Sequence, residues 1–147
     1  MAELTVTRRF DQPPEKVFDA WLNPDVARRF LFTTADSQVV VCEIDGRVGG
    51  RFNIVDRRQG QDDIAHIGEY LEIDRPRRLV FTFGVPQFDP TMTTVAIDIA
   101  PDGEGCVLSL HHTDVTEEWR DGTIDGWTRI LASLEPALEG RHAAGWR

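Results

Sequence analysis

TIDGWTRILASLEPALE, residues Thr123 to Glu139, is the segment with the clearest structural pattern in the sequence. Its large apolar residues recur at helical spacing and form one continuous stripe along a helix. The stripe consists of Ile124, Trp127, Leu131, Leu134 and Leu138, with Ile130 on its flank. At ~1.5 Å per residue such a helix is about 25 Å long, enough to cross the sheet of a small domain. We therefore expect a long helix that ends at Gly140. The upstream chain should form the sheet against which this helix packs.

The 147-residue chain has the size of one globular domain, which we expect at residues 1–140 with a tail at 141–147. Its formal charge of −9 disfavours a nucleic-acid partner, because such binding needs clusters of basic residues. No apolar run approaches the ~20 residues of a membrane span, and the first residues lack the apolar segment of a secretory signal. These features predict a cytoplasmic protein without a membrane span.

The two cysteines, Cys42 and Cys106, stand apart from each other and from any histidine at metal-binding spacing. Reduced thiols are therefore expected, with no metal site and no cofactor. The sequence also lacks a nucleophile elbow, a phosphate-binding glycine loop and the HExxH pattern. The sequence thus predicts a fold more clearly than a reaction.

Upstream of the long helix, one strand at 3–10 is followed by two short helices. The first begins after Asp11 or Gln12 and ends at Asn23, and the second runs from Pro24 to about Arg29. Period-two alternation then predicts six strands, at about 38–45, 50–57, 64–74, 77–84, 92–100 and 105–113. Because the connections are short, neighbouring strands should be antiparallel. The expected fold is a two-layer α+β domain with a curved antiparallel sheet of about seven strands.

Strict alternation assigns one apolar and one polar face to the sheet. It places Glu69 on the apolar face with Leu71 and Ile73, and it places His66 on the exposed face. A bulge at Gly68 would turn Glu69 outward instead. Both arrangements of this strand stay open.

Five blocks of the sequence resemble one known family. They are TRRFDQPPEKVFDAWLNP at 7–24, GRVGGRF at 46–52, HIGEYLEIDRPRRLVFTF at 66–83, GEGCVLSLHHTDV at 103–115 and GWTRILASL at 126–134. Together they resemble the branch of the START/SRPBCC helix-grip superfamily named for the activator of the heat-shock-protein-90 ATPase. In the eukaryotic activator this fold is the C-terminal domain, and the present chain is similar to single-domain bacterial-type members.

The resemblance implies a cavity between the long helix and the curved sheet. Related superfamily members bind lipids, sterols or polyketides, and a few are cyclases or hydrolases. His112 aligns with a histidine that recurs in the resembled motif. Where relatives often carry a tryptophan, this chain has Phe30, which implies a different pocket shape at that point.

The predicted ligand-binding cavity combines aromatic residues, inward sheet residues and one arginine. Its members are Trp21, Phe30, Phe52, Ile54, Phe81, Phe83, His112, Trp119, Arg120, Trp127 and Leu131. The aromatic residues are also of the kind that simply fills a core at ordinary density. Arg120 faces the cavity if the long helix starts as early as Thr116, and faces solvent if it starts near Asp121.

Three functions follow as hypotheses. The first is a domain that binds a small apolar or amphipathic molecule in the cavity. The second is an enzyme of cyclase or hydrolase type, with His112 and Glu69 as acid and base, which requires the two side chains to lie close together. The third is a co-chaperone-like interaction domain with a chaperone partner, which requires an exposed apolar patch.

Overall fold

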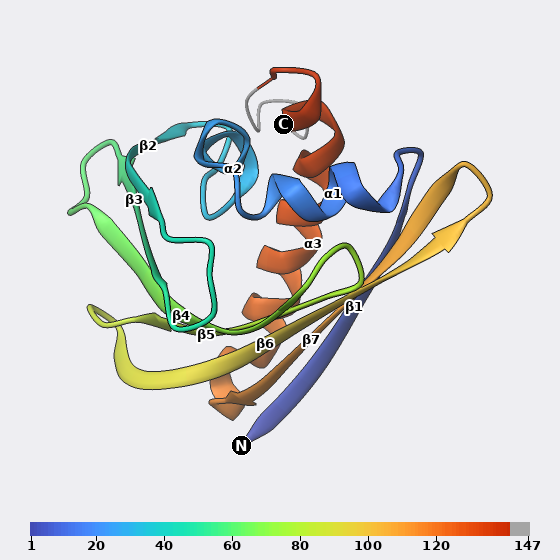
Figure 1. Cartoon of the computed structure of the whole chain (residues 1–147). Coiled ribbons are helices and arrows are strands. Elements are labelled where there is room, and N and C mark those ends of the chain that lie inside the picture. The colour runs from blue at the N-terminus through green and yellow to red at the C-terminus, as the bar shows by residue number, and fades with distance from the viewer. Residues whose placement is uncertain (142–147) are drawn as a thin grey trace.

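The computed structural model describes residues 1–141, so the predicted tail at 141–147, apart from Arg141, lies outside the described residues. One strand, two short helices, six strands and a long helix follow one another along the chain (Figure 1). The strands are β1 (Ala2–Phe10), β2 (Ser37–Ile44), β3 (Arg51–Arg58), β4 (Ile64–Asp74), β5 (Arg78–Val85), β6 (Asp89–Asp102) and β7 (Gly105–Val115). The helices are α1 (Pro14–Ala20), α2 (Pro24–Phe30), a 3₁₀ turn at Glu117–Trp119 and α3 (Arg120–Leu138).

The strands form a single antiparallel sheet in the order β1-β7-β6-β5-β4-β3-β2. Every neighbouring pair except β1 with β7 is consecutive in sequence, which short connections favour. Figure 1 shows the sheet bent around α3, with α1 and α2 near the C-terminal end of that helix. The predicted α+β helix-grip fold is confirmed.

The two short helices begin where the sequence places proline. Pro14 and Pro24 occupy first-turn positions, where the missing N–H costs no hydrogen bond. The Oδ1 atom of Asn23 accepts a hydrogen bond from the backbone N–H of Asp25 at 3.0 Å, which caps α2. The long helix starts at Arg120, three residues before the quoted stretch, and Gly140 follows it with φ +84°.

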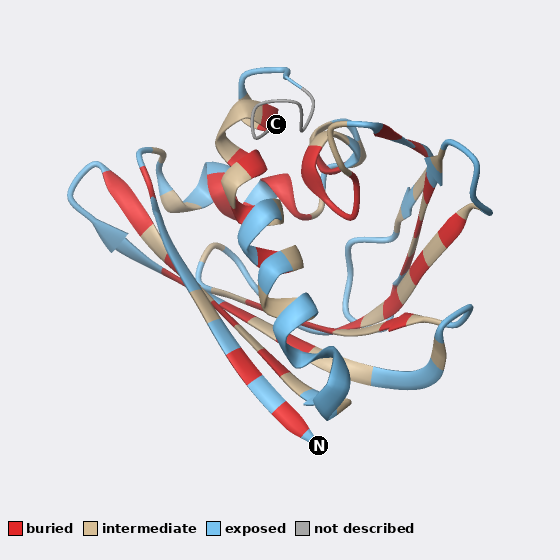
Figure 2. Cartoon of the chain, turned by 180° about the vertical axis from the view of Figure 1, so that it is seen from behind, coloured by how far each residue is buried: buried red, intermediate tan, exposed pale blue. Residues whose placement is uncertain are grey.

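The core lies between α3 and the concave face of the sheet. Trp127, Leu131 and Leu134 of α3 are buried, as the predicted stripe requires. They belong to the same apolar cluster as the inward side chains of β6 and β7, such as Ile97 and Leu110. Figure 2 shows buried segments where the helices face the sheet and exposed segments on the outer side of α3. Among the described residues, no helix is both long and apolar enough to cross a membrane.

The alternation predicted for β4 is wrong in its first half. Its pairing with β5 shifts between Tyr70 and Glu72, so the bulge lies after Tyr70 and not at Gly68. The inward residues before the bulge include His66 and Tyr70, both buried, whereas Leu71 is 46% exposed. Each bulge reverses the phase of the following residues, so a pattern anchored on the end of the strand misplaces its beginning.

Gly68 occupies an inward position of β4 where no side chain fits. A Cβ at this residue would lie 1.9 Å from the carbonyl oxygen of Thr82 and 2.3 Å from the ring of Phe52. The absent side chain therefore lets the Phe52 ring pack across the strand. Gly84 on β5 differs, because a Cβ there would meet chiefly the Sδ atom of the flexible Met92 side chain.

We expect Gly68→Ala to lower the free energy of unfolding by about 1–3 kcal/mol through overpacking against backbone and ring. The matched variant Gly84→Ala should cost clearly less, since Met92 is 40% exposed and is free to move. Urea unfolding of the three proteins measures both differences. Equal stabilities of the two variants would contradict this account of Gly68.

Candidate functional site

Two adjoining hollows lie between the N-terminal half of α3 and the sheet. The larger has a volume of about 290 Å³ and the smaller about 110 Å³. Both are lined by Phe83 and Val85 of β5 and by Thr123 of α3. Phe83 and its neighbours thus separate two compartments of one site.

The larger hollow has an apolar and a polar side. Its apolar lining is Phe32, Phe83, Val85, Trp127 and Ile130. Its polar lining is Thr33, Thr34, Arg58, His66, Thr123 and Arg129, and Gly126 completes it. Such a mixed lining suits a ligand that is itself partly apolar and partly polar.

Phe32 closes the inner end of the larger hollow. Its ring stacks on His66 at 4.5 Å and on Phe83 at 5.0 Å between centroids, and it meets Trp127 edge-on at 5.8 Å. The backbone of Phe32 has φ +57°, a conformation that costs a bulky residue about 1–3 kcal/mol. Behind the ring, between α1 and the sheet, only about 10 Å³ of space is left. The ring contacts hold Phe32 in this conformation, and the interior behind it is filled.

His112 links α3 to three strands through a directed chain of hydrogen bonds. The indole Nε1–H of Trp127 donates to Nδ1 of His112 at 3.0 Å. Because an indole nitrogen only donates, the neutral ring carries its proton on Nε2, which donates to Oγ1 of Thr93 at 2.7 Å. The Thr93 hydroxyl in turn donates to the carbonyl oxygen of Phe83 at 2.9 Å. Burial lowers the pKa of His112 to about 4, which matches the neutral ring that this chain requires.

His66 lies on the wall of the larger hollow and is also neutral near pH 7. Its Nδ1 donates to the carbonyl oxygen of Ile54 at 3.1 Å, and its ring lies flat against Phe32. Burial lowers the pKa of His66 to about 4, while the hydrogen bond to Ile54 and the nearby Asp56 carboxylate oppose the shift. The sequence prediction of an exposed His66 is wrong, because the bulge after Tyr70 places this half of β4 in the other phase.

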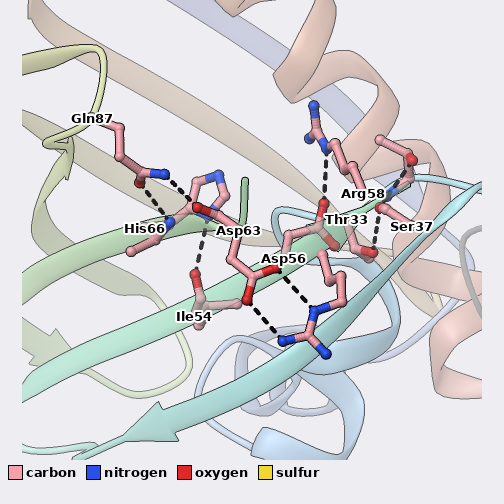
Figure 3. A network of polar contacts seen from close by, with 11 residues as sticks. Thr33, Ser37, Ile54, Asp56, Arg58, Asp63, His66 and Gln87 are labelled. Carbon is pink, nitrogen blue, oxygen red and sulfur yellow. Dashed lines mark hydrogen bonds and ion pairs between the residues drawn. The ribbon is translucent and has the colours of Figure 1, made fainter. Parts of the chain in front are cut away.

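Asp56 and Arg58 form an ion pair beside this wall (Figure 3). Arg58 donates from Nε to Oδ2 of Asp56 at 3.0 Å, and the Asp56 side chain is fully buried. The other carboxylate oxygen, Oδ1, is buried without a hydrogen-bond partner among the described residues. A buried carboxylate is costly without an opposite charge, so this contact fixes the orientation of Arg58.

A second group of contacts in Figure 3 ties the neighbouring loops together. Gln87 accepts from the backbone N–H of Ala65 at 2.9 Å and donates to the carbonyl oxygen of Asp63. Thr33 and Ser37 share a hydrogen bond of 3.1 Å between their hydroxyl oxygens. The contacts of Gln87 fix the β5–β6 connection against the start of β4. The Thr33–Ser37 bond fixes the loop between α2 and β2.

The predicted cavity residues fall into three places. Phe83, His112, Trp119 and Trp127 line one or both hollows. Trp21, Phe52 and Phe81 surround the space of about 10 Å³ behind Phe32, and Phe30, Ile54 and Leu131 are fully buried among core side chains. The structure therefore places the open space nearer the N-terminal end of α3 than the sequence pattern suggested.

Arg120 points away from both hollows. It is the first residue of α3, its side chain is 45% exposed, and its Nε donates to the carbonyl oxygen of Glu3 at 3.3 Å. The tight 3₁₀ turn before α3 delays the helix beyond Thr116, so the arrangement in which Arg120 faces the cavity is not observed.

Glu69 and His112 lie on opposite faces of the sheet. Glu69 borders a depression on the outer face together with Arg51 and Thr82, whereas His112 is bonded to Trp127 on the inner face. The two side chains cannot exchange a proton across the sheet. The acid–base pair proposed from the sequence is therefore not formed.

Several lining residues escaped the sequence reasoning although a signal for some of them existed. Asp56 and Arg58 continue the inward alternation of Phe52 and Ile54 along β3. Continuing the alternation for two more inward positions along β3 identifies both residues. Phe32 is of the aromatic type expected in a cavity, but no simple pattern predicts where its ring lies, because its position depends on a left-handed backbone in the loop after α2. Over residues 1–141, no three His, Cys, Asp or Glu side chains are grouped to hold a metal ion.

A seven-stranded antiparallel sheet curved around a long C-terminal helix, with two short helices after the first strand, defines a helix-grip domain of the START/SRPBCC type. Within that class, the chain belongs to the family described as Activator of Hsp90 ATPase homolog 1-like protein, whose model matches residues 11–139. Comparison with curated proteins gives no significant match.

Solved structures of several proteins share this fold. A protein from Chromobacterium violaceum is 24% identical with a TM-score of 0.80, over 91% of this chain and 95% of its own. An AHSA1-like protein from Aeromonas hydrophila is 22% identical with a TM-score of 0.77, over 95% and 93%. An Hsp90 activator from Plasmodium falciparum is 21% identical with a TM-score of 0.72, over 95% and 97%. At these identities the likeness is one of fold.

The two buried histidines predict a loss of stability in mild acid. At pH values well above 6.5 they are neutral in both the folded and the unfolded chain and give no pH dependence. Between pH 6.5 and about 4 the unfolded chain binds protons that the folded chain does not, so the free energy of unfolding falls as the pH falls. Each histidine accounts for up to about 3 kcal/mol of this loss.

Urea unfolding at a series of pH values between 8 and 4 measures the effect. His112→Gln should remove about half of the slope, because His66 remains. A free energy of unfolding that stays constant from pH 7 to 5 would show that both imidazoles accept protons in the folded protein. Among the pKa shifts of carboxyl groups, those of Asp19, Asp63 and Asp89 are downward, so their contribution is lost only at lower pH.

Proposed function

We propose that the protein binds a small apolar or amphipathic molecule in the larger hollow, and that it does so in the cytoplasm. The observation that carries the proposal is the open space at Gly126. A Cβ added to this residue would meet no atom within 4 Å, although the residue lies on the side of α3 that faces the hollow. The larger hollow therefore borders bare helix backbone at this residue.

A glycine inside a helix lowers helix stability by about 0.5–1 kcal/mol relative to alanine. A helix that only had to cover the sheet would gain from a side chain at position 126, which would fill the space with apolar contacts. The glycine at position 126 is explained if the empty space itself is needed, as it is for binding a ligand. The volume of about 290 Å³ is close to the lower end of the range of small-molecule sites.

The polar lining supports a ligand with two kinds of surface. Trp127, Phe83 and Ile130 offer apolar contact, and the threonine and arginine side chains lie around them. His66 and His112 are neutral and engaged in hydrogen bonds. Neither is paired with a carboxylate that would make it a stronger base, so binding fits the site better than acid–base catalysis.

The test compares two glycines of the same helix. Gly126→Leu should abolish ligand binding by filling the hollow, whereas Gly122→Leu should leave binding intact, since Gly122 is exposed and borders neither hollow. Both variants should be as stable as the parent chain or more stable, because both replace a helical glycine. This choice is better than Trp127→Ala, which would also break the bond to His112.

Binding is measured by native mass spectrometry of the purified proteins and by a thermal-shift screen with fatty acids, fatty alcohols, sterols and aromatic polyketide-like compounds. A ligand that raises the Tm of the parent chain by several degrees should also raise that of Gly122→Leu but not that of Gly126→Leu. No co-purified mass and no shift with any compound would contradict the proposal.

Chaperone interaction is the second candidate, and one surface feature favours it. The rings of Phe88 and Trp119 lie 6.3 Å apart between centroids, and the two residues are 57% and 43% exposed. Such paired exposed aromatic residues are typical of protein-binding surfaces. The family carries the name of an Hsp90 ATPase activator, and one similar structure is an Hsp90 activator.

If this second function holds, the purified protein should raise the ATPase rate of a purified Hsp90-type chaperone. The double variant Phe88→Ser and Trp119→Ser should lose the effect. Val48→Ser should keep it, because Val48 is even more exposed, at 63%, but lies in the loop between β2 and β3. An unchanged ATPase rate with the parent chain would exclude this function.

A further inference from the structure

The charged side chains that line the larger hollow are both basic, and each pairs with a carboxylate that lies outside the lining. Among the described residues 1–141, its two charged lining residues, Arg58 and Arg129, are both arginines, and none of its lining residues is acidic. The whole chain, in contrast, has 25 acidic and 16 basic residues. Arginine donors at the wall of a hollow, in an otherwise acidic protein, offer an anion a direct contact.

Arg58 is held in a position to bind that anion. Its contact with Asp56 uses Nε, and no other hydrogen bond of its guanidinium is formed within residues 1–141. The Nη1 and Nη2 groups therefore remain as donors, and the side chain is 36% exposed at the hollow. Because the Asp56 carboxylate is buried and immobile, the donors of Arg58 are oriented before a ligand arrives.

We propose that the ligand of this hollow is an amphipathic carboxylate, with its carboxylate on the terminal nitrogens of Arg58 and its apolar part against Trp127, Phe83 and Ile130. This inference rests on the proposed function and names the chemical class of the ligand. Asp56 is a positioning residue in this arrangement, since it acts through Arg58.

A singly charged group fits the site better than a phosphate. Each of the two arginines is already paired with one carboxylate, Arg58 with Asp56 and Arg129 with Asp125 at 3.1 Å. His66 adds no positive charge, because it is buried and neutral near pH 7. A dianion would find too little positive charge to replace its hydration, whereas one carboxylate matches the planar fork of one guanidinium.

Three matched probes with the same apolar chain test the proposal by isothermal titration: octanoate, 1-octanol and octyl phosphate. We expect octanoate to bind the parent chain at least tenfold more tightly than octanol, and at least as tightly as octyl phosphate. The preference over octanol should weaken as salt is raised, since part of the arginine side chain is exposed.

Variants of two neighbouring residues of β3 test whether Arg58 is the residue that binds the carboxylate. Arg58→Gln should reduce octanoate affinity to that of octanol and leave octanol affinity unchanged. Arg57→Gln is the matched control. Arg57 directly precedes Arg58 on β3 but pairs with Asp63 outside the hollow. The Arg57→Gln variant should therefore bind octanoate like the parent chain. If Arg58→Gln does not fold because Asp56 loses its partner, the double variant Asp56→Asn and Arg58→Gln removes both charges and should show the same loss.

The possible failures differ. Equal affinity for octanoate and octanol, or a full octanoate preference after loss of Arg58, would overturn the carboxylate inference and leave the binding function intact. A clear preference for octyl phosphate would also overturn it. Failure of all three probes, together with a negative screen of the wider compound set, would overturn both the inference and the proposed function.

Discussion

The hydrogen bond from Trp127 to His112 is the contact on which the rest of the site depends. It joins the middle of α3 to β7, and through Thr93 and Phe83 the same chain reaches β6 and β5. On the C-terminal side of Trp127, the helix packs against a filled core through Leu131 and Leu134. On its N-terminal side, Gly126 and Thr123 carry little or no side-chain bulk, and the hollows begin. The anchored indole thus lies where the filled core meets the hollows, and the larger hollow extends past it to Arg129 and Ile130.

Much of the fold could be predicted from the sequence because periodicity reports burial directly. The apolar stripe of α3 and the alternation of β5, β6 and β7 depend only on which side chains face the core, and these elements were found within a few residues. β4 was misread because a bulge is a property of strand pairing. Nothing in its own alternation shows where the partner strand slips by one residue, so His66 was assigned to the wrong face and the face of Glu69 stayed open.

The site was harder to predict than the fold, for a related reason. Periodicity identifies which side chains point inward but not how closely the two layers approach. Trp21, Phe52 and Phe81 point inward as expected and close the interior almost completely, while the free space lies beside Gly126, a residue without a side chain. The ring of Phe32 separates these two regions, and its placement requires a positive φ that phenylalanine disfavours. Such a position is set by the surrounding rings and not by the local sequence.

The interior polar groups support holding a ligand more than transforming one. A general base works best when its pKa lies near the working pH, and both buried histidines are far below it. Their ring protons are committed to Ile54 and Thr93, so a proton transfer would first break a contact that supports the walls of the hollow. Arg58 has the opposite character, because its charge is permanent and its terminal donors are not used by Asp56. The two buried histidines are therefore neutral and hydrogen-bonded, whereas Arg58 keeps a permanent positive charge at the hollow, as the proposed carboxylate site requires.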